Sequence, residues 1–291
     1  MSFDPTKSSF LILNKKKGFS SNGELNYLKR LLKIKKAGFC GTLDPLAQGV
    51  LVVAIEKATK LISLATGFDK VYSGKIKLGF TSDSLDLGTE LIPSGTIPQN
   101  IDCAEIEKKF QGVISQIPPA YSALKIDGKR AYKLAREGKT PEMKARNVEI
   151  KTLEITRTGE YELSFWVKCS KGTYIRTLAG DIGKFLGCGA VLTELIRREV
   201  GPFKLENAVS IDELKENPEN IEKALLSVPE FLTGSNSCEV NEEGFKYLKN
   251  GNKIEELNLN LKNGLNLIKF NGEVFLIVEK TDEIASYFAF V

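Results

Sequence analysis

The segment GFCGTLDPLAQGVLVVAI, residues 38–55, contains the side chain with the clearest potential for chemistry, Asp44. Asp44 lies between a Gly-Thr turn and a proline, and Asp-Pro pairs usually form turns. Gly41 and Gly49 flank it and would let the backbone approach a bulky ligand closely. The apolar run at 50–55 predicts a strand buried on both faces. A carboxylate held on a loop at the end of such a strand is a candidate reactive group.

The chain contains no histidine, and its five cysteines are odd in number and widely spaced. No two cysteines stand at the spacing of a metal or redox motif. The composition therefore excludes histidine-assisted nucleophiles and most zinc chemistry. The reactive side chains that remain are aspartate, glutamate, tyrosine, lysine and arginine. For Asp44 itself, a purely structural role in the turn stays the ordinary alternative.

The composition is that of a globular protein, with 291 residues, 42% apolar and 27% charged. This length suits one large domain or two unequal ones. No run of about 18 apolar residues occurs, so we expect no membrane span. The N-terminus has only a short apolar patch before its charges, which predicts a cytoplasmic protein without a secretory signal.

The charge is divided unevenly along the chain. Residues 1–204 hold 33 basic and 21 acidic side chains, whereas residues 205–291 hold 8 basic and 16 acidic ones. The balances are therefore +12 and −8. This division predicts a basic body that binds a polyanion, followed by an acidic region with another role.

Two basic segments indicate RNA as the polyanion. Residues 15–36 contain eight basic side chains and one glutamate, and residues 125–146 contain eight basic and three acidic ones. Tyr121 and Tyr132 lie near the second segment. Cations that hold phosphate, interleaved with rings that stack on bases, are typical of RNA-binding surfaces. A solvated basic face is the alternative interpretation.

The hydrophobic periodicity predicts an alternation of strands and helices. Strands are expected at 10–13, 50–55, 71–80, 161–167 and 189–203, and helices beginning near Asn22, Glu56, Asp102, Lys129 and Thr173. Ser21 and Glu24 could form a capping box for the first helix, and Thr173 could cap the last. The third helix is expected to include Val113 in its apolar stripe. The polar, turn-rich residues 81–100 suit a long surface connection.

The C-terminal region has its own strand pattern. Asn271 and Gly272 separate two alternating apolar runs, which favours a hairpin with a type I′ turn. The polar segment TGSNS at 233–237 marks a boundary before this region. Residues 233–291 are therefore expected to form a small, mostly β module.

Six segments together resemble one known family. The segment AGFCGTLDPLAQGVLVVAIEKATK resembles the signature segment of the TruB family of pseudouridine synthases, whose bacterial members are the tRNA pseudouridine-55 synthases. The resemblance extends, in family order between residues 14 and 203, to NKKKGFSSN, DKVYSGKIKLG, IPPAYSALKIDGKRAYKLAREG, SKGTYIRTLAGDIG and LTELIRREVGPF.

The resemblance implies an α+β fold. Its catalytic domain, residues 1–232, would contain a mixed, largely antiparallel sheet and an RNA-binding insert at about 81–146, followed by a PUA-like β module at 233–291. The implied reaction detaches uracil from its ribose, turns it over and rejoins it through carbon. It needs no metal, nucleotide or flavin. The implied partner is the T-stem-loop of tRNA, whose target uridine is flipped into the pocket by a stand-alone, monomeric enzyme.

The resemblance also assigns catalytic residues. Asp44 matches the family nucleophile, and Arg176 matches the arginine that pairs with it. Tyr72 matches a tyrosine that would stack on the base and could move a proton at the sugar. The carboxylate must be ionised while sheltered from water, so a cationic partner is expected.

Four further residues match substrate-binding positions. Tyr174 and Ile196 match pocket positions that contact the uracil, and Lys15 matches a lysine beside the active-site loop. Phe39 stands where many family members have a histidine associated with the RNA loop, so stacking is kept and two hydrogen-bonding nitrogens are lost. Lys16 likewise replaces a usual proline.

Three other functions stay open at this point. A tRNA-binding folding factor would need the basic surfaces but not the set of Asp44, Tyr72, Tyr174 and Arg176. A guide-RNA-dependent catalytic subunit would share the same core. A phosphatase or dehalogenase with an aspartate nucleophile would need a second carboxylate two residues on, where the chain has Leu46.

Overall fold

The computed structural model describes residues 4–122, 124–126, 128–138, 143–282 and 284–290. Its strands are β1 (Ser9–Lys15), β2 (Ala37–Cys40), β3 (Gln48–Ile55), β4 (Lys70–Leu78), β5 (Phe80–Thr81), β6 (Ile92–Pro93), β7 (Gly112–Gln116), β8 (Lys125–Ile126), β9 (Lys129–Arg130), β10 (Arg146–Arg157), β11 (Glu162–Cys169), β12 (Ala190–Val200), β13 (Phe203–Lys204), β14 (Leu225–Ser227), β15 (Asn236–Glu239), β16 (Gly264–Phe270), β17 (Glu273–Lys280) and β18 (Ala285–Phe290). Its α-helices are α1 (Ser21–Leu31), α2 (Ile62–Gly67), α3 (Cys103–Phe110), α4 (Ala131–Arg136), α5 (Ile175–Phe185), α6 (Ile211–Glu216), α7 (Val228–Phe231) and α8 (Glu242–Lys249). The 3₁₀ turns are η1 (Glu56–Leu61), η2 (Leu205–Asn207), η3 (Pro218–Ala224) and η4 (Ile254–Leu257). No helix among these described residues is long and apolar enough to cross a membrane.

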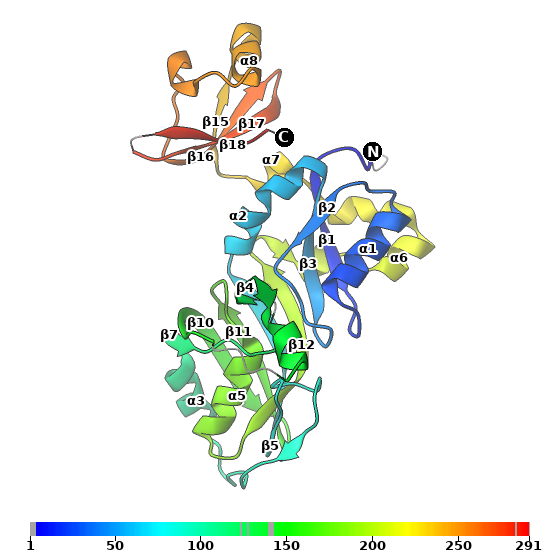
Figure 1. The fold of residues 1–291 in the computed structure, drawn as a ribbon, viewed down its shortest axis with the longest axis vertical. Helices are drawn as coiled ribbons and strands as arrows, with labels where there is room; N and C mark the ends of the chain where they lie inside the picture. The colour runs from blue at the N-terminus through cyan, green and yellow to red at the C-terminus, as the bar shows by residue number, and fades with distance from the viewer. Residues whose placement is uncertain (1–3, 123, 127, 139–142, 283, 291) are drawn as a thin grey trace.

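One large sheet organises the body of the molecule (Figure 1). Within the described residues it has ten strands, in the order β14-β1-β3-β12-β4-β11-β10-β7, with β2 paired to β3 and β13 paired to β12. Strands β3 and β12 run parallel where Gln48 faces Ile196, and the other pairings of this sheet are antiparallel. The predicted α+β fold with a largely antiparallel sheet is confirmed.

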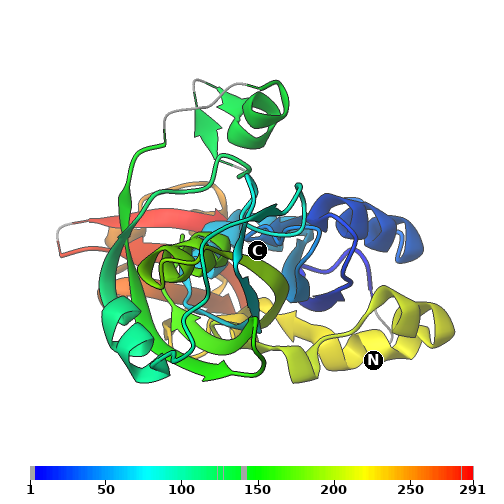
Figure 2. The same ribbon diagram turned by 90° about the horizontal axis from the view of Figure 1, so that it is seen from below.

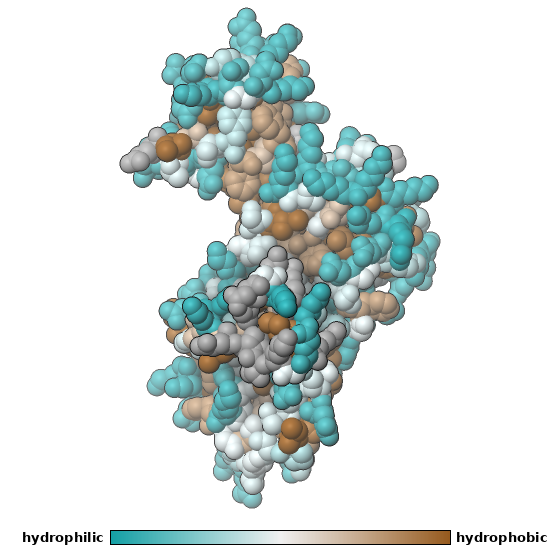
Figure 3. Space-filling view, in the orientation of Figure 1, coloured by the Kyte–Doolittle hydropathy of each residue, from teal (hydrophilic) through white to brown (hydrophobic). Residues whose placement is uncertain are grey.

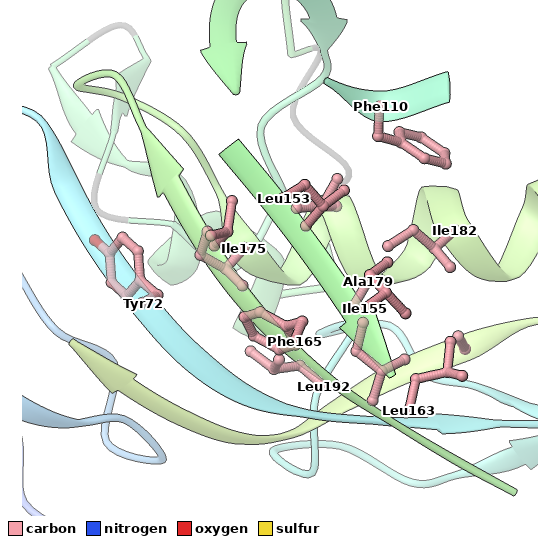
Figure 4. Close-up of a cluster of buried hydrophobic side chains, with 14 of the residues drawn as sticks. Tyr72, Phe110, Leu153, Ile155, Leu163, Phe165, Ile175, Ala179, Ile182 and Leu192 are labelled. Carbon is pink, nitrogen blue, oxygen red and sulfur yellow. The ribbon is translucent and has the colours of Figure 1, made fainter. Parts of the chain in front are cut away.

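Helix α5 packs on one face of this sheet. The alternation in β4 directs Tyr72 and Ile76 to the buried face and Lys75 to the other, as a pleated strand requires. Figure 4 shows side chains of β10, β11 and β12 beside those of α5, among them Ile182, with Tyr72 of β4 at the edge of the cluster. The buried cluster fixes α5, and therefore its first residues, relative to the strands.

Strands β1 and β3 are buried on both faces. Helices α1 and α6 cover one face, where Leu11 and Val53 join a cluster with Leu28 of α1. On the other face Phe10 and Val52 pack in a second cluster. This double burial explains why residues 50–55 form an uninterrupted apolar run rather than an alternating one.

The C-terminal residues form a separate four-stranded sheet, β15-β16-β17-β18. The positive φ angles of Asn271 (52°) and Gly272 (79°) confirm the predicted type I′ hairpin. Leu267 and Ile277 of this module share a buried cluster with Phe231 of the body. Figure 3 shows brown and tan side chains where module and body meet, below the mostly hydrophilic surface of the module. We retain the division into residues 1–232 and 233–291 as a proposal.

The insert at 81–146 has two parts with different positions. Figure 2 shows the short hairpin β8–β9 and helix α4 projecting away from the rest of the body. The basic helix begins at Ala131, two residues later than predicted, and Asp127 of the expected Asp-Gly turn lies outside the described residues. Residues 81–100 are not simply a surface connection, because Ser84 and Asp86 are buried.

Three local predictions were displaced. The N-cap of α1 is Ser20, whose hydroxyl accepts from the Gly23 N–H at 3.0 Å, and not Ser21. The N-cap position of α5 is occupied by Tyr174 rather than Thr173. Val113 lies in β7 and is 71% exposed, because α3 ends at Phe110.

Candidate active site

The loop between β2 and β3 presents Asp44 and is held by contacts from distant parts of the chain. The hydroxyl of Ser21, at the start of α1, both accepts from the Leu43 N–H and donates to the Leu43 carbonyl, each at 2.9 Å. The Gly18 N–H donates to the Pro45 carbonyl at 2.7 Å. Ser21 therefore fixes the loop beside the carboxylate, which explains why its hydroxyl does not cap the helix.

Arg176, in the first turn of α5, pairs with Asp44. The Nε atom of Arg176 lies 2.8 Å from Oδ2 of Asp44 and 3.6 Å from Oδ2 of Asp86. Its Nη1 donates to the Ser84 carbonyl at 2.9 Å and its Nη2 to the Tyr121 carbonyl at 2.8 Å. Each of the three guanidinium nitrogens thus has an oxygen partner, so Arg176 is held in one orientation. Only 5% of its side chain is exposed.

The environment of Asp44 shifts its pKa in both directions. Burial raises the pKa of the carboxyl above its ordinary 3.8, the positive charge of Arg176 opposes that rise, and the negative charge of Asp86 adds to it. The side chain still exposes 37% of its surface, so solvent reaches it and offsets part of the burial. The direct contact with Arg176 favours the ionised form of the carboxyl.

A pocket of about 310 Å³ opens beside Asp44, and we call it the Asp44 pocket. Tyr72 of β4 and Tyr174 line it together with Arg176. Figure 4 shows Tyr72 at the edge of the apolar cluster, with its hydroxyl directed away from the other labelled side chains. Burial raises the pKa of the Tyr72 hydroxyl, and also that of Tyr174, so both stay protonated near neutral pH.

Tyr174 is positioned through its backbone. Its N–H donates to Oε1 of Gln116 at 3.0 Å, and its carbonyl accepts from Nε2 of the same side chain at 3.3 Å. Gln116 ends β7 and is fully buried. The entry to α5, with Tyr174 and Arg176, is thereby tied to the far edge of the sheet.

Lys15 lies behind the active-site loop rather than in the pocket. It is fully buried, and its Nζ donates to the Ala47 carbonyl at 2.6 Å and to the Lys16 carbonyl at 2.8 Å. Burial lowers the pKa of its amine to about 8. Lys15 therefore supports the loop that carries Asp44, and its positive charge favours the carboxylate.

The structure does not bring Ile196 to the Asp44 pocket. Ile196 lines another pocket, on the opposite face of β12, whereas its neighbour Leu195 lines the Asp44 pocket. Consecutive residues of a strand point to opposite faces, so Leu195 and not Ile196 faces Asp44 in the structure.

Phe39 lies on another side of Asp44. It lines a hollow of about 670 Å³ that also includes Asp44 and the rings of Tyr121 and Tyr132. Asp44 therefore lies between the Asp44 pocket and this second hollow, which is lined by aromatic residues. The hollow reaches the insert, which supplies the two tyrosines.

Two charged residues of the site were not predicted from the sequence. Arg197 is 1% exposed, lines the Asp44 pocket, and donates from Nε to the Val50 carbonyl at 2.7 Å and from Nη2 to the Gly41 carbonyl at 3.0 Å. Asp86 is the second carboxylate beside Arg176. The alternation of the strand could have indicated Arg197, because Arg197 points to the same face of β12 as the apolar Leu195. No sequence pattern indicated Asp86, because its segment resembles a solvent-exposed turn.

The arrangement can perform nucleophilic catalysis without a metal. The partly exposed carboxylate is held by Arg176, which also donates hydrogen bonds to two backbone carbonyls. The carboxylate faces a pocket with two protonated tyrosines and the apolar side chain of Leu195. Such a pocket fits a planar ring, with the carboxylate able to attack an electrophilic carbon beside it.

Comparison with known proteins identifies the family. The model described as "TruB family pseudouridylate synthase (N terminal domain)" matches residues 29–175, and "tRNA pseudouridylate synthase B C-terminal domain" matches residues 176–232. This chain belongs to the TruB family of pseudouridylate synthases. The TruB-family protein named tRNA pseudouridine synthase B from Francisella philomiragia subsp. philomiragia is 48% identical over 209 residues, which are 71% of this chain and 69% of the relative. The protein of the same name from Francisella tularensis subsp. holarctica is 47% identical over the same shares.

Solved structures show the same fold for this TruB-family chain. A chain of a Cbf5-Nop10-Gar1 complex matches with a TM-score of 0.70 at 24% identity, covering 100% of this chain and 88% of its own length. A chain of the archaeal box H/ACA sRNP Nop10-Cbf5 complex matches with a TM-score of 0.67 at 24% identity, covering 96% and 84%. Since both matches extend over almost the whole chain, they include the C-terminal module.

Proposed function

We propose that this protein converts uridine to pseudouridine in tRNA, with Asp44 as the nucleophile. The observation that carries the proposal is the 2.8 Å ion pair between Asp44 and Arg176 at the wall of a pocket that also holds Tyr72 and Tyr174. The relatives named tRNA pseudouridine synthase B, at 48% and 47% identity, support tRNA as the substrate.

The proposed reaction breaks one bond to the ribose and forms another. The Asp44 carboxylate attacks C1′ as the C1′–N1 bond breaks, and the electron pair of that bond stays on N1 of the uracil. After the uracil has turned, its C5 forms a bond to C1′ and the carboxylate leaves. C5 then loses its proton and N1 gains one. The product is an isomer of the substrate, so the balance needs no redox or group-donating cofactor.

Each side chain of the pocket has a proposed part in this reaction. Arg176 keeps Asp44 ionised and aimed. Tyr72 stacks on the uracil, and its protonated hydroxyl can donate a hydrogen bond or move a proton at the sugar. Tyr174 and Leu195 line the same pocket and would contact the uracil.

We further propose that the RNA reaches this pocket by flipping one nucleotide of the T-loop. Flipping a base costs a few kcal/mol, which stacking and backbone contacts must offset. The hollow with Phe39, Tyr121 and Tyr132 offers rings for the neighbouring bases. The basic residues of 1–204, with their balance of +12, would hold the phosphates. A monomeric, stand-alone, cytoplasmic enzyme is part of the same proposal.

The experiment that tests the proposal measures tritium release from tRNA transcripts labelled at uracil C5. We expect one release per tRNA with the wild type and none with Asp44→Asn, because the amide is a poor nucleophile. Binding of tRNA by the variant should stay largely intact, since Asp44 contributes little to phosphate contacts. Asp181→Asn, which changes a surface carboxylate paired with Lys184, is the matched control and should keep full turnover.

Two results would contradict the proposal. Substantial turnover by Asp44→Asn would remove Asp44 as the nucleophile. Tight, salt-sensitive tRNA binding without any tritium release by the wild type would favour a folding factor, and release that depends on added guide RNA would favour a guided subunit. Replacing the T-loop uridine should abolish release if that uridine is the target.

A further inference from the structure

Arg197 of β12 carries a buried charge that the proposed reaction does not use. Its side chain is 1% exposed, and in the described part of the chain no carboxylate lies within 4.0 Å of its guanidinium. Burial of a charge without a carboxylate partner is unfavourable for folding. Such exceptions are expected at functional sites, and Arg197 lines the Asp44 pocket.

The guanidinium of Arg197 bonds both ends of the loop that carries Asp44. Its Nη2 donates to the carbonyl of Gly41, before Asp44 in the chain, at 3.0 Å, and its Nε donates to the carbonyl of Val50, after Asp44, at 2.7 Å. The side chain lies against Gly41, since a Cβ on that glycine would be 3.5 Å from Nη1. One planar group with donors in a fixed geometry therefore joins the two ends of the loop.

Arg197 is also the cross-strand neighbour of Tyr72. Strand β12 lies between β3 and β4, and in its antiparallel pairing with β4 Arg197 is directly opposite Tyr72. Side chains that are opposite each other in an antiparallel pair lie on the same face of the sheet. Both side chains line the Asp44 pocket. Burial raises the pKa of the Tyr72 hydroxyl, and the positive charge of Arg197 opposes that rise.

We propose that Arg197 is a positioning residue that holds the loop of Asp44 in place relative to Tyr72. This inference rests on the proposed function, in which the carboxylate attacks C1′ of the same nucleotide whose uracil stacks on Tyr72. A displacement of about 1 Å between reacting groups can lower a rate by about 100-fold. Because Arg197 is buried, it acts through these two residues and does not contribute a phosphate contact.

The first measurement is kcat and KM for tritium release by two variants of Arg197. Arg197→Met fills a similar space without any donor, so kcat should fall by about 100-fold while KM stays unchanged. Arg197→Lys keeps the charge but cannot reproduce the planar bridge to both carbonyls, so its kcat should lie between those of Arg197→Met and the wild type.

Arg157→Met is the matched control. The three guanidinium nitrogens of Arg157 donate to the carbonyls of Gly159, Gln99 and Glu160, at the end of β10, and Arg157 does not line the Asp44 pocket. This variant should lower the free energy of unfolding by loss of the same kind of hydrogen bond and keep the wild-type kcat. The comparison separates positioning from stability alone.

A double-mutant cycle tests whether Arg197 acts through the loop. Ser21 bonds Leu43 of the same loop from α1 and does not bond Arg197. Independent losses of kcat would multiply in the double variant Ser21→Ala/Arg197→Lys. We expect a smaller loss than this product, because either substitution already loosens the loop. Losses that multiply would contradict the proposal.

Amide hydrogen exchange of residues 41–47 provides a measurement that needs no turnover. Exchange should be faster in Arg197→Lys than in the wild type and unchanged in Arg157→Met. The proposal is overturned if the Arg197 variants keep the wild-type kcat, or if exchange in this loop is unchanged. If Arg197→Met does not fold, Arg197→Lys decides by the same two criteria. Absence of tritium release by the wild type would instead count against the proposed function, and the exchange measurement would still test the hold of Arg197 on the loop.

Discussion

The charge on Asp44 is set by burial and by its charged neighbours Asp86 and Arg176, and the effects of these two neighbours can be separated by mutation. Burial and the negative charge of Asp86 raise the pKa of the Asp44 carboxyl, and Arg176 lowers it. A nucleophilic carboxylate acts only when it is ionised. Because its pKa is raised, the rate should fall on acidification at a pH above the ordinary 3.8 of an aspartate.

Mutations of the two partners of Asp44 should therefore move the acid limb of the pH–rate profile in opposite directions. Asp86→Asn removes a negative charge and lowers the pKa of Asp44, so the limb moves to lower pH. Arg176→Gln removes the positive charge, so the limb moves to higher pH and the rate also drops at every pH. The measurement is single-turnover kcat/KM from about pH 4 to pH 8. Shifts of both variants in the same direction would contradict this description of the site.

At the scale of the element, two adjacent serines perform different tasks. Ser20 caps α1, whereas the buried Ser21 bonds both polar groups of the Leu43 backbone in the active-site loop. Ser21→Ala should lower the free energy of unfolding by about 1–3 kcal/mol, because the Leu43 N–H loses its partner. It should also lower kcat.

Ser20→Ala is the control for this prediction. It should cost about 1 kcal/mol, the usual value of an N-cap, and leave kcat unchanged because Ser20 does not bond the loop. Urea unfolding and turnover of the two variants give the comparison. Equal effects on kcat would show that the Ser21 contact does not position Asp44.

The parallel contact of β3 with β12 depends on a glycine. A Cβ on Gly49 would lie 2.3 Å from the Arg197 carbonyl oxygen, and its φ of +107° disfavours other residues. Gly112 has a similar φ of +97° with no atom within 4 Å of a Cβ. Gly112→Ala should cost about 1–2 kcal/mol through backbone strain alone. Gly49→Ala should cost more by about 1–3 kcal/mol, because the two strands must separate. Equal unfolding free energies of Gly49→Ala and Gly112→Ala would mean that β3 and β12 are not in tight contact at Gly49.

At the scale of the whole molecule, we expect the C-terminal module to contribute to stability rather than to RNA affinity. Leu267 and Ile277 share a buried cluster with Phe231, so removing residues 233–291 exposes apolar surface of the body. Residues 233–291 hold 6 basic and 9 acidic side chains, a balance of −3, which does not favour phosphate binding. We expect a truncated chain to melt at a lower temperature and to keep its tRNA affinity.

Thermal unfolding and tRNA binding over a range of salt concentrations test this expectation. The slope of affinity against salt reports the number of phosphate contacts, and it should be the same for both chains. A loss of affinity beyond about tenfold, or a reduced slope, would place part of the RNA-binding surface on the module.

The sequence by itself determined the features that depend on local patterns. The alternation in β4 and β11, the uninterrupted apolar run of β3 and the Asn271-Gly272 turn each predicted the element that the structure has. Periodicity and turn chemistry act between neighbours in the chain, so they can be read without knowing the fold. Family resemblance similarly indicated Asp44 and Arg176, which the structure brings into contact.

Only the tertiary structure decided which side chains complete the site. Asp86 and Arg176 are ninety residues apart in the chain and meet only because α5 packs on the sheet. Strand β12 has register shifts between Leu192 and Glu194 and between Arg197 and Glu199, and its Leu195 and Arg197, not Ile196, line the Asp44 pocket. The sequence pattern cannot contain this information, because a bulge is fixed by the pairing with β4 and a buried polar group by its distant partner.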